Sequence, residues 1–205
     1  DNQILTSAHI VSGGKFIEVQ KENDSKKYEA IIKYISNQAD LAIVEISDKS
    51  FFENTKPLEI TEDVKIKDSV TAIGYPIGGN TISTTTGIVS RIEYKAYVWN
   101  PWMNNLAIQI DAAINSGNSG GAVLNKDNKI VGIAMMKLTN ADNISYIVPS
   151  VVINTFLNDI KDGKVDGFPQ TRTRVQHIEN QDMKDYLGLK DDYGVLISKV
   201  DVEDV

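Results

Sequence analysis

Three residues of the types that carry out nucleophilic catalysis lie far apart in the chain: His9, Asp40 and Ser119. A serine hydroxyl is a weak nucleophile until a neighbouring imidazole takes its proton. The imidazole in turn needs a carboxylate that fixes its tautomer and stabilises its cation. If folding brings the three side chains together, they predict a hydrolytic triad.

The serine lies in the glycine-rich stretch INSGNSGGAV, residues Ile114–Val123, between two apolar segments. Glycine tolerates backbone angles that place N–H groups where a side chain would otherwise clash. Fixed N–H donors stabilise a developing oxyanion, and losing one typically costs about 100- to 1000-fold in rate. We therefore expect the loop Gly117, Asn118 and Ser119 to form an oxyanion hole, with the N–H groups of Gly117 and Ser119 as donors.

Gly117–Gly121 also fits the G-x-S-x-G pattern of a nucleophile elbow, which requires a helix directly after the serine and a later histidine. Here strand-like residues follow Ser119, and the only later histidine, His177, lies beyond a linker. The order His, Asp, Ser is instead that of chymotrypsin. Taken singly, His9 and Asp40 could be ordinary strand-end residues and Ser119 a turn residue; their joint pattern favours the triad.

Composition excludes several other classes of function. The 205 residues are 41% hydrophobic and 24% charged, and the net charge of −7 disfavours nucleic acid and anionic membrane surfaces as partners. No apolar run approaches the roughly 20 residues that span a bilayer, so we expect no membrane insertion. The chain has no Cys and only two His, so we predict neither a metal site nor a cofactor.

Short β-branched segments separated by turn residues dominate the first 150 residues, which predicts a β-sandwich or barrel. A helix is expected from Ser150 to Gly163, and a second, short helix after Asn180 is followed by a strand at Val195–Val200. The predicted strands of the first part are Phe16–Gln20, Tyr28–Ile35, Leu41–Ile46, Val70–Ile73, Thr81–Ile92, Leu106–Asp111, Ala122–Asn125, Ile130–Met136 and Ile144–Val148.

In the segments around His9, Asp40 and Ser119, the sequence resembles the Deg/HtrA serine proteases. It is most similar to the plant-type Deg branch of that family. The resemblance covers most of residues 4 to 170; only Ala122 departs from the motif, where the family most often has proline. The resembling segments are Leu5–Val11, Asp40–Ile43, Gly74–Gly79, Ile108–Asn115, Asn115–Gly121, Ile144–Pro149 and Gly167–Pro169.

The resemblance implies an all-β fold: a chymotrypsin-like double β-barrel with a C-terminal helix, followed by the beginning of a PDZ domain. Residues 1–165 would form the protease domain without its N-terminal strands, 166–174 a linker and 175–205 a partial PDZ domain. It also implies ATP-independent endoproteolysis of unfolded or damaged proteins by a homotrimer that can assemble into larger cages. The compartment stays open.

The family pattern further implies a primary specificity pocket lined by Ile114, Ile144, Ser145 and Tyr146. No acidic residue stands among them to pair with lysine or arginine, so we expect a preference for small or medium apolar residues. The alternative is that they are plain core residues.

Two alternatives remain open from the sequence. The chain could be a protease-like chaperone that holds unfolded polypeptides with a resting or inactive site. The tryptophan-containing segment Tyr97–Trp102 could be a regulatory or subunit contact, or it could fold back onto the barrel.

Overall fold

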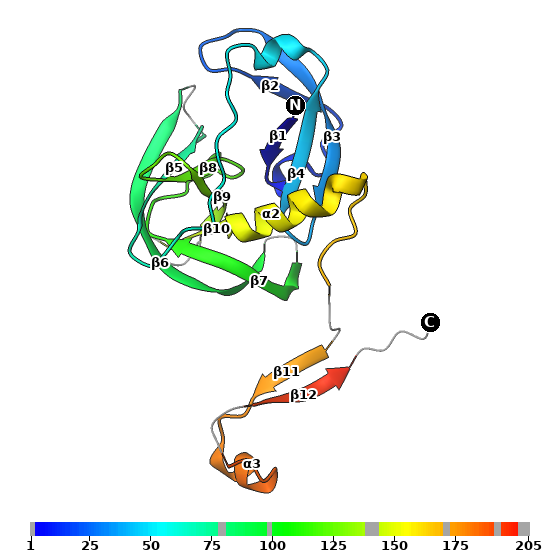
Figure 1. Ribbon diagram of the computed structural model, residues 1–205, viewed down its shortest axis with the longest axis vertical. Helices are drawn as coiled ribbons and strands as arrows, with labels where there is room; N and C mark the ends of the chain where they lie inside the picture. Colours follow the sequence, from blue (N-terminus) through cyan, green and yellow to red (C-terminus); the bar gives the residue numbers. More distant parts are fainter. Residues whose placement is uncertain are drawn as a thin grey trace. The chain divides into compact units, whose positions relative to one another are not determined.

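The computed structural model describes residues 3–77, 81–97, 100–137, 144–169, 173–190 and 194–200. The chain divides into two units, Asp1–Gly167 and Phe168–Val205. The first unit contains an open sheet and a closed barrel, which Figure 1 shows in blue and in green. Gly78 and Gly79 of the family-like turn lie outside the described residues.

The open sheet is antiparallel and has the strand order β1-β4-β3-β2. β1 pairs with β4 from Gln3↔Glu45 to Thr6↔Ala42, so the segment leading to His9 lies beside the strand that follows Asp40. The strands are β1 at Gln3–Thr6, β2 at Ile17–Gln20, β3 at Lys27–Ser36 and β4 at Leu41–Ile46.

One face of this sheet carries the apolar core. In β3 the alternation of buried Tyr28 and Ala30 with exposed Lys27 and Glu29 follows the two-residue period of a strand. The Tyr28 ring meets Phe51 edge-on at 5.1 Å between centroids. Phe51 belongs to the short 3-10 helix η1 at Lys49–Phe52, and the helix α1 at Ala8–Val11 packs against β3 and β4.

The second sheet closes into a six-stranded barrel, because β10 pairs with both β7 and β9. Its interior is filled by fully buried aliphatic side chains, among them Val70, Val89, Ile108, Ile110 and Ile147. The strands are β5 at Ser69–Gly74, β6 at Ser83–Tyr97, β7 at Asn100–Ile110, β8 at Ala122–Asn125, β9 at Ile130–Lys137 and β10 at Ser145–Pro149.

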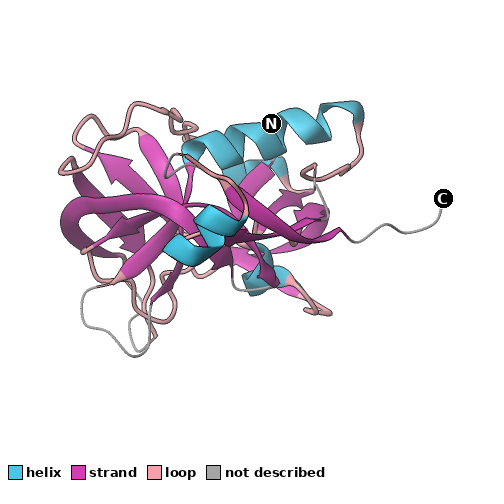
Figure 2. Ribbon diagram, turned by 90° about the horizontal axis from the view of Figure 1, so that it is seen from below, coloured by secondary structure: helices cyan, strands magenta, loops and turns pink. Residues whose placement is uncertain are grey.

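The predicted helix is α2 at Ser150–Asp159, the longest among the described residues (Figure 2). It packs against β9 and β10 and buries Val152, Ile153 and Phe156. It continues as the 3-10 turn η2 at Ile160–Asp162 and ends at Gly163, whose φ of 91° is left-handed. Pro149, rather than Ser150, stands at the N-cap position. In the described part of the chain, no helix has the length and apolar character needed to cross a membrane.

The second unit contains a two-stranded antiparallel sheet of β11 at Thr173–His177 and β12 at Val195–Val200, with α3 at Gln181–Tyr186 between them. Asn180 caps α3 as predicted, since its side-chain oxygen accepts from the Met183 N–H at 3.2 Å. The sequence pattern does not predict the strand β11; it forms because Thr173–His177 finds a partner in β12. That this unit begins a PDZ domain remains a prediction.

The predicted all-β class is confirmed by this architecture of one closed barrel and one open sheet. One of the two expected barrels is closed. The other half is a four-stranded sheet whose outer strands, β1 and β2, each pair with a single neighbour among the described residues.

Candidate active site

His9 and Asp40 form a paired acid and imidazole. His9 Nδ1 lies 2.7 Å from Asp40 Oδ2, and the His9 backbone N–H donates to Asp40 Oδ1 at 2.9 Å. The Asp40 side chain is completely buried, whereas the His9 side chain keeps 17% of its surface exposed. A carboxylate can only accept hydrogen bonds, so Nδ1 carries the proton and Nε2 is left as the acceptor of the ring.

The turn before β4 aims this carboxylate. Asp40 has a left-handed φ of 52°, a conformation that aspartate adopts more readily than most residues. The Ala39 N–H donates to Ser36 Oγ at 3.3 Å, and the Ala8 N–H donates to the Asp40 carbonyl at 3.1 Å. The first of these bonds closes the turn, and the second holds the turn against the start of α1.

The Ser119 loop packs against the segment that leads to His9. The Ala134 carbonyl in β9 accepts both the Gly120 N–H at 2.8 Å and the Ser7 hydroxyl at 3.3 Å. A Cβ atom on Gly120 would lie 2.3 Å from the Thr6 hydroxyl oxygen. Glycine at position 120 thus allows the residue after Ser119 to approach β1, the strand that ends three residues before His9.

Ser119 Oγ donates to the Met135 carbonyl at 3.2 Å. Within the described ranges, no hydrogen bond joins Ser119 to His9. The structure therefore pairs His9 with Asp40 directly and brings the chain around Ser119 to the same segment, while the serine hydroxyl points to β9.

The peptide between Ser116 and Gly117 has a defined orientation. The Ile77 N–H donates to the Ser116 carbonyl at 2.9 Å. Because a trans peptide holds its C=O and N–H in opposite directions, the Gly117 N–H points away from Ile77. Gly117 has a φ of 100°, and a Cβ there would lie 2.5 Å from the Tyr75 carbonyl oxygen. Only glycine fits this position without moving the loop.

Asn118, the middle residue of the predicted oxyanion loop, is buried. Its backbone N–H donates to the Asn115 carbonyl at 2.9 Å, and its carbonyl accepts from the Gly121 N–H at 3.0 Å. These bonds make a tight turn and leave the Asn118 N–H occupied. Its side chain lies against Gly74, where a Cβ would come within 2.6 Å of Asn118 Oδ1.

The four predicted pocket residues have different surroundings in the structure. The Ile114 N–H donates to Ser145 Oγ at 3.1 Å, and both residues are buried. Tyr146 instead donates its hydroxyl to Glu93 Oε1 at 2.9 Å. This bond holds the pKa of Glu93 below its ordinary value, and burial, followed by the bond to Glu93, raises the pKa of Tyr146. Ile144 is half-buried just before β10.

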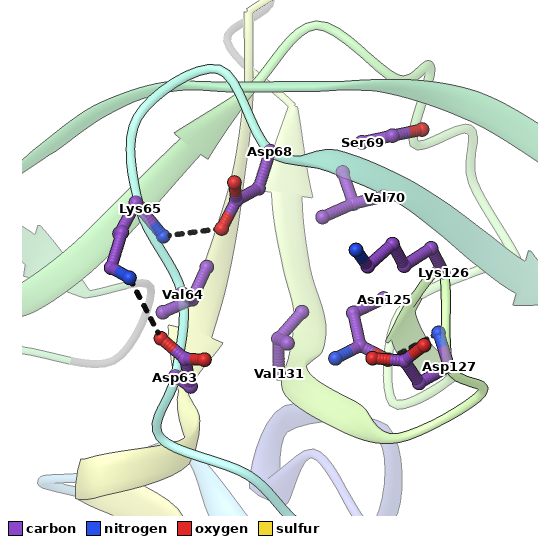
Figure 3. A pocket seen from close by; sticks show the side chains of 10 residues that line it. All are labelled: Asp63, Val64, Lys65, Asp68, Ser69, Val70, Asn125, Lys126, Asp127 and Val131. Carbon is purple, nitrogen blue, oxygen red and sulfur yellow. Dashed lines mark hydrogen bonds and ion pairs between the residues drawn. The ribbon is translucent and has the colours of Figure 1, made fainter.

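Two cavities are lined by other residues. A small one of about 240 Å³ lies at the 63–68 and 125–127 turns, where the Lys65 N–H donates to Asp68 and Lys65 Nζ pairs with Asp63 (Figure 3). A larger apolar one of about 660 Å³ lies between the sheets and includes Leu5, Ile43 and Gly120 in its walls. Among the described residues, no group of three or more His, Asp or Glu is placed to hold a metal ion.

Sequence reasoning missed the parts of the site that act through the backbone. The carbonyls of Ala134 and Met135 and the N–H of Ile77 hold the loop, and their side chains give no sign of this role. The segment Gly74–Gly79 resembles a family turn, and this resemblance carried no sign that the Ile77 N–H contacts the serine loop.

A closed barrel beside a second antiparallel sheet, with a histidine paired to a buried aspartate and a glycine-flanked serine loop packed on the segment before that histidine, is the arrangement of trypsin-like serine peptidases. Residues 1–133 match the family model described as a trypsin-like peptidase domain. The chain is 40% identical over 200 residues to the mitochondrial protease Do-like 4 of Arabidopsis thaliana, an alignment that covers 97% of this chain and 38% of that protein. It is 38% identical to the serine protease DegP homolog of Plasmodium falciparum, covering 96% and 24%.

Among solved structures, the HtrA-type protease AlgW with a decapeptide superposes with a TM-score of 0.75 at 25% identity, covering 97% of this chain and 60% of AlgW. The chain belongs to the trypsin-like peptidase family, and within it to the Deg/HtrA proteases. It spans well under half of the length of both the Arabidopsis and the Plasmodium protease.

Proposed function

We propose that the protein is an ATP-independent serine endopeptidase of unfolded or damaged polypeptides, with His9, Asp40 and Ser119 as its triad. The observation that carries this proposal is the short contact between His9 Nδ1 and the fully buried Asp40 carboxylate. A carboxylate in that position fixes the imidazole tautomer with Nε2 as the proton acceptor.

In the proposed reaction, Ser119 rotates away from the Met135 carbonyl and gives its proton to His9 Nε2 as Oγ attacks the peptide carbonyl. The Asp40 carboxylate stabilises the imidazolium that forms, and His9 then protonates the leaving amine. Water hydrolyses the resulting acyl-enzyme in the same way. The N–H groups of Gly117 and Ser119 bind the oxyanion, which agrees with the orientation that Ile77 imposes on the Ser116–Gly117 peptide.

The substrate class rests on family membership and on a solved relative that carries a decapeptide. For the residue before the cut bond, the lack of an acid among Ile114, Ile144, Ser145 and Tyr146 supports a small or medium apolar side chain. Glu93 is engaged by Tyr146 and Arg91, which argues against a free acid there for a basic side chain. A homotrimer, a larger cage and a PDZ domain beginning in the second unit belong to the same proposal.

One observation favours a second function, that of a protease-like scaffold which holds unfolded chains. The Ser119 hydroxyl bonds to the Met135 carbonyl at 3.2 Å, which is the arrangement of a resting nucleophile. A substrate or effector would then have to release it before cleavage.

The test compares casein digestion by the parent chain, Ser119→Ala and the matched control Ser25→Ala, an exposed serine away from the loop. The parent and Ser25→Ala should digest casein and react with a fluorophosphonate probe, and Ser119→Ala should do neither. Cleavage by Ser119→Ala at the parent rate would contradict the assigned nucleophile. If no variant cleaves and all equally prevent aggregation of a denatured client, the scaffold function is supported instead.

A further inference from the structure

The hairpin formed by β6 and β7 of the closed barrel reaches the turn that carries Asp40 in the open sheet. The side-chain amide of Asn105 in β7 donates from Nδ2 to the Gln38 carbonyl at 2.7 Å, in a partly buried position. The two residues are 67 positions apart in the chain. This bond therefore links the closed barrel to the open sheet two residues before the Asp40 carboxylate.

The bond from Asn105 can affect the backbone geometry of this turn. Ser36 and Leu41 are paired across it, so only four residues reverse the chain, and the last of them, Asp40, has a left-handed φ of 52°. A change in the tilt of the Gln38–Ala39 peptide alters the backbone angles that lead into Asp40. Because the carboxylate has to meet both the N–H and Nδ1 of His9, small changes in these angles move it off at least one of them.

The same hairpin also carries a buried tyrosine that is influenced by the charge of Asp40. Tyr97 at the end of β6 is fully buried, and its hydroxyl donates to the carbonyl of Leu106, the residue after Asn105. Burial raises the pKa of the Tyr97 hydroxyl, and the charge of Asp40 adds to this effect. The Tyr97 ring is thus close enough to sense the Asp40 carboxylate, and its hydrogen bond fixes the strand position from which Asn105 extends.

We propose that Asn105 is a positioning residue for Asp40: from the closed barrel, its amide holds the 37–40 turn so that the carboxylate stays on His9 Nδ1. The expected change in kcat rests on the proposed peptidase function. The effect of Asn105 on the His9–Asp40 contact does not. The residue touches neither substrate nor reacting atoms and acts only through the turn.

The test uses the full chain with Asn105→Ala and the control Asn104→Ala, which changes the neighbouring, exposed asparagine of the same strand. The chain has only two histidines, so ring labelling with ¹⁵N gives one signal set for His9 and one for His177, which serves as the internal reference in the other unit. In Asn105→Ala, the downfield Nδ1 proton of His9 should broaden or move upfield. In Asn104→Ala, it should stay as in the parent.

In peptide hydrolysis, Asn105→Ala should lower kcat about 5- to 10-fold with KM unchanged, the effect of one hydrogen bond that acts on the transition state. If Asn105→Ala does not fold, Asn105→Leu keeps the branching and approximate size of the side chain, removes the donor without adding a charge and should give the same changes. An unaltered His9 proton with unaltered kcat, equal changes in Asn104→Ala, or a change in KM alone would overturn the proposal. A shifted His9 signal in a chain whose parent lacks activity would contradict the peptidase function and leave the positioning role standing.

Discussion

The two halves of the first unit hold their parts of the candidate site by different means. The open sheet contributes His9 and Asp40, which are joined side chain to side chain and side chain to backbone. The closed barrel contributes Ser119, whose loop is held by backbone hydrogen bonds and by glycines packed directly on neighbouring chain. The His9–Asp40 pair therefore depends on which side chains are present. The Ser119 loop depends on glycines, which have no side chain.

This difference follows from what each half has available. A four-stranded sheet with two outer strands cannot enclose a polar group by wrapping around it, so Asp40 is buried in a turn that other elements cover. A closed barrel fixes its strand ends from all sides, so a loop between β7 and β8 can be shaped by close backbone contacts with the chain after β5, with β9 and with Thr6 of the open sheet. We therefore expect substitutions in the two halves to fail in different ways.

The largest effect is expected in the open sheet, from Asp40→Asn. The amide keeps the size of the carboxylate, but it brings N–H donors to a position where two His9 donors already point. The imidazole then loses its preferred tautomer, and kcat should fall by about 10⁴. Peptide hydrolysis measures this, with Asp48→Asn, an exposed carboxylate of the same half, as the control. A loss of less than about tenfold would show that Asp40 does not orient His9.

A smaller effect is expected in the closed barrel, from Gly117→Ala. The added Cβ would lie 2.5 Å from the Tyr75 carbonyl oxygen and 2.8 Å from the Ile77 nitrogen, so the Ser116–Gly117 peptide must move. Loss of one oxyanion donor predicts a drop in kcat of about 100- to 1000-fold. The matched control is Gly163→Ala, which has a similar left-handed φ of 91° but nothing within 4 Å of the new Cβ. Equal losses in both variants would assign the effect to backbone strain instead.

The sequence predicted the fold class and most strands because period-two alternation and turn residues are local signals. β3 shows this, since buried and exposed positions alternate along its first half, whereas the almost continuously buried β4 was predicted from its β-branched, apolar residues. The segment Tyr97–Trp102 shows the limit. Its residues indicate a loop, yet β6 extends to Tyr97 and β7 begins at Asn100, because the two strands pair along most of their length.

The candidate site could be predicted as residue types in order, but not as contacts. Nothing about Ser119 in the sequence indicates that its hydroxyl bonds to the Met135 carbonyl. The motif around Tyr146 assigns this residue to the predicted specificity pocket. In the structure, its hydroxyl donates a hydrogen bond to Glu93 on β6. Such partners depend on which strands become neighbours in the barrel, and this pairing is a property of the whole chain.

The smallest effect concerns acid stability, where the two halves differ in their paired carboxylates. In the open sheet, a hydrogen bond from Lys26, followed by one from Ser50, lowers the pKa of Asp48 from 3.8 to about 2. The bond from Lys33 likewise lowers the pKa of Glu45. In the closed barrel, the pKa of Glu93 is lowered mainly by the Tyr146 hydroxyl, which carries no charge.

A carboxylate whose pKa is lower in the folded chain than in the unfolded chain stabilises the fold above the unfolded value, and this contribution disappears as the pH falls through the folded value. Asp48→Asn should therefore lower Tm slightly at pH 7, by about 1 °C or less for an exposed pair, and the difference should shrink as the pH falls from about 4 toward 2. Thermal unfolding followed by circular dichroism at several pH values measures it. In the Lys26→Met background the same substitution should have less effect, because the main partner is gone. A Tm difference that stays constant from pH 4 to pH 2 would mean that the pair does not contribute, and that the open sheet resists acid by its apolar core alone.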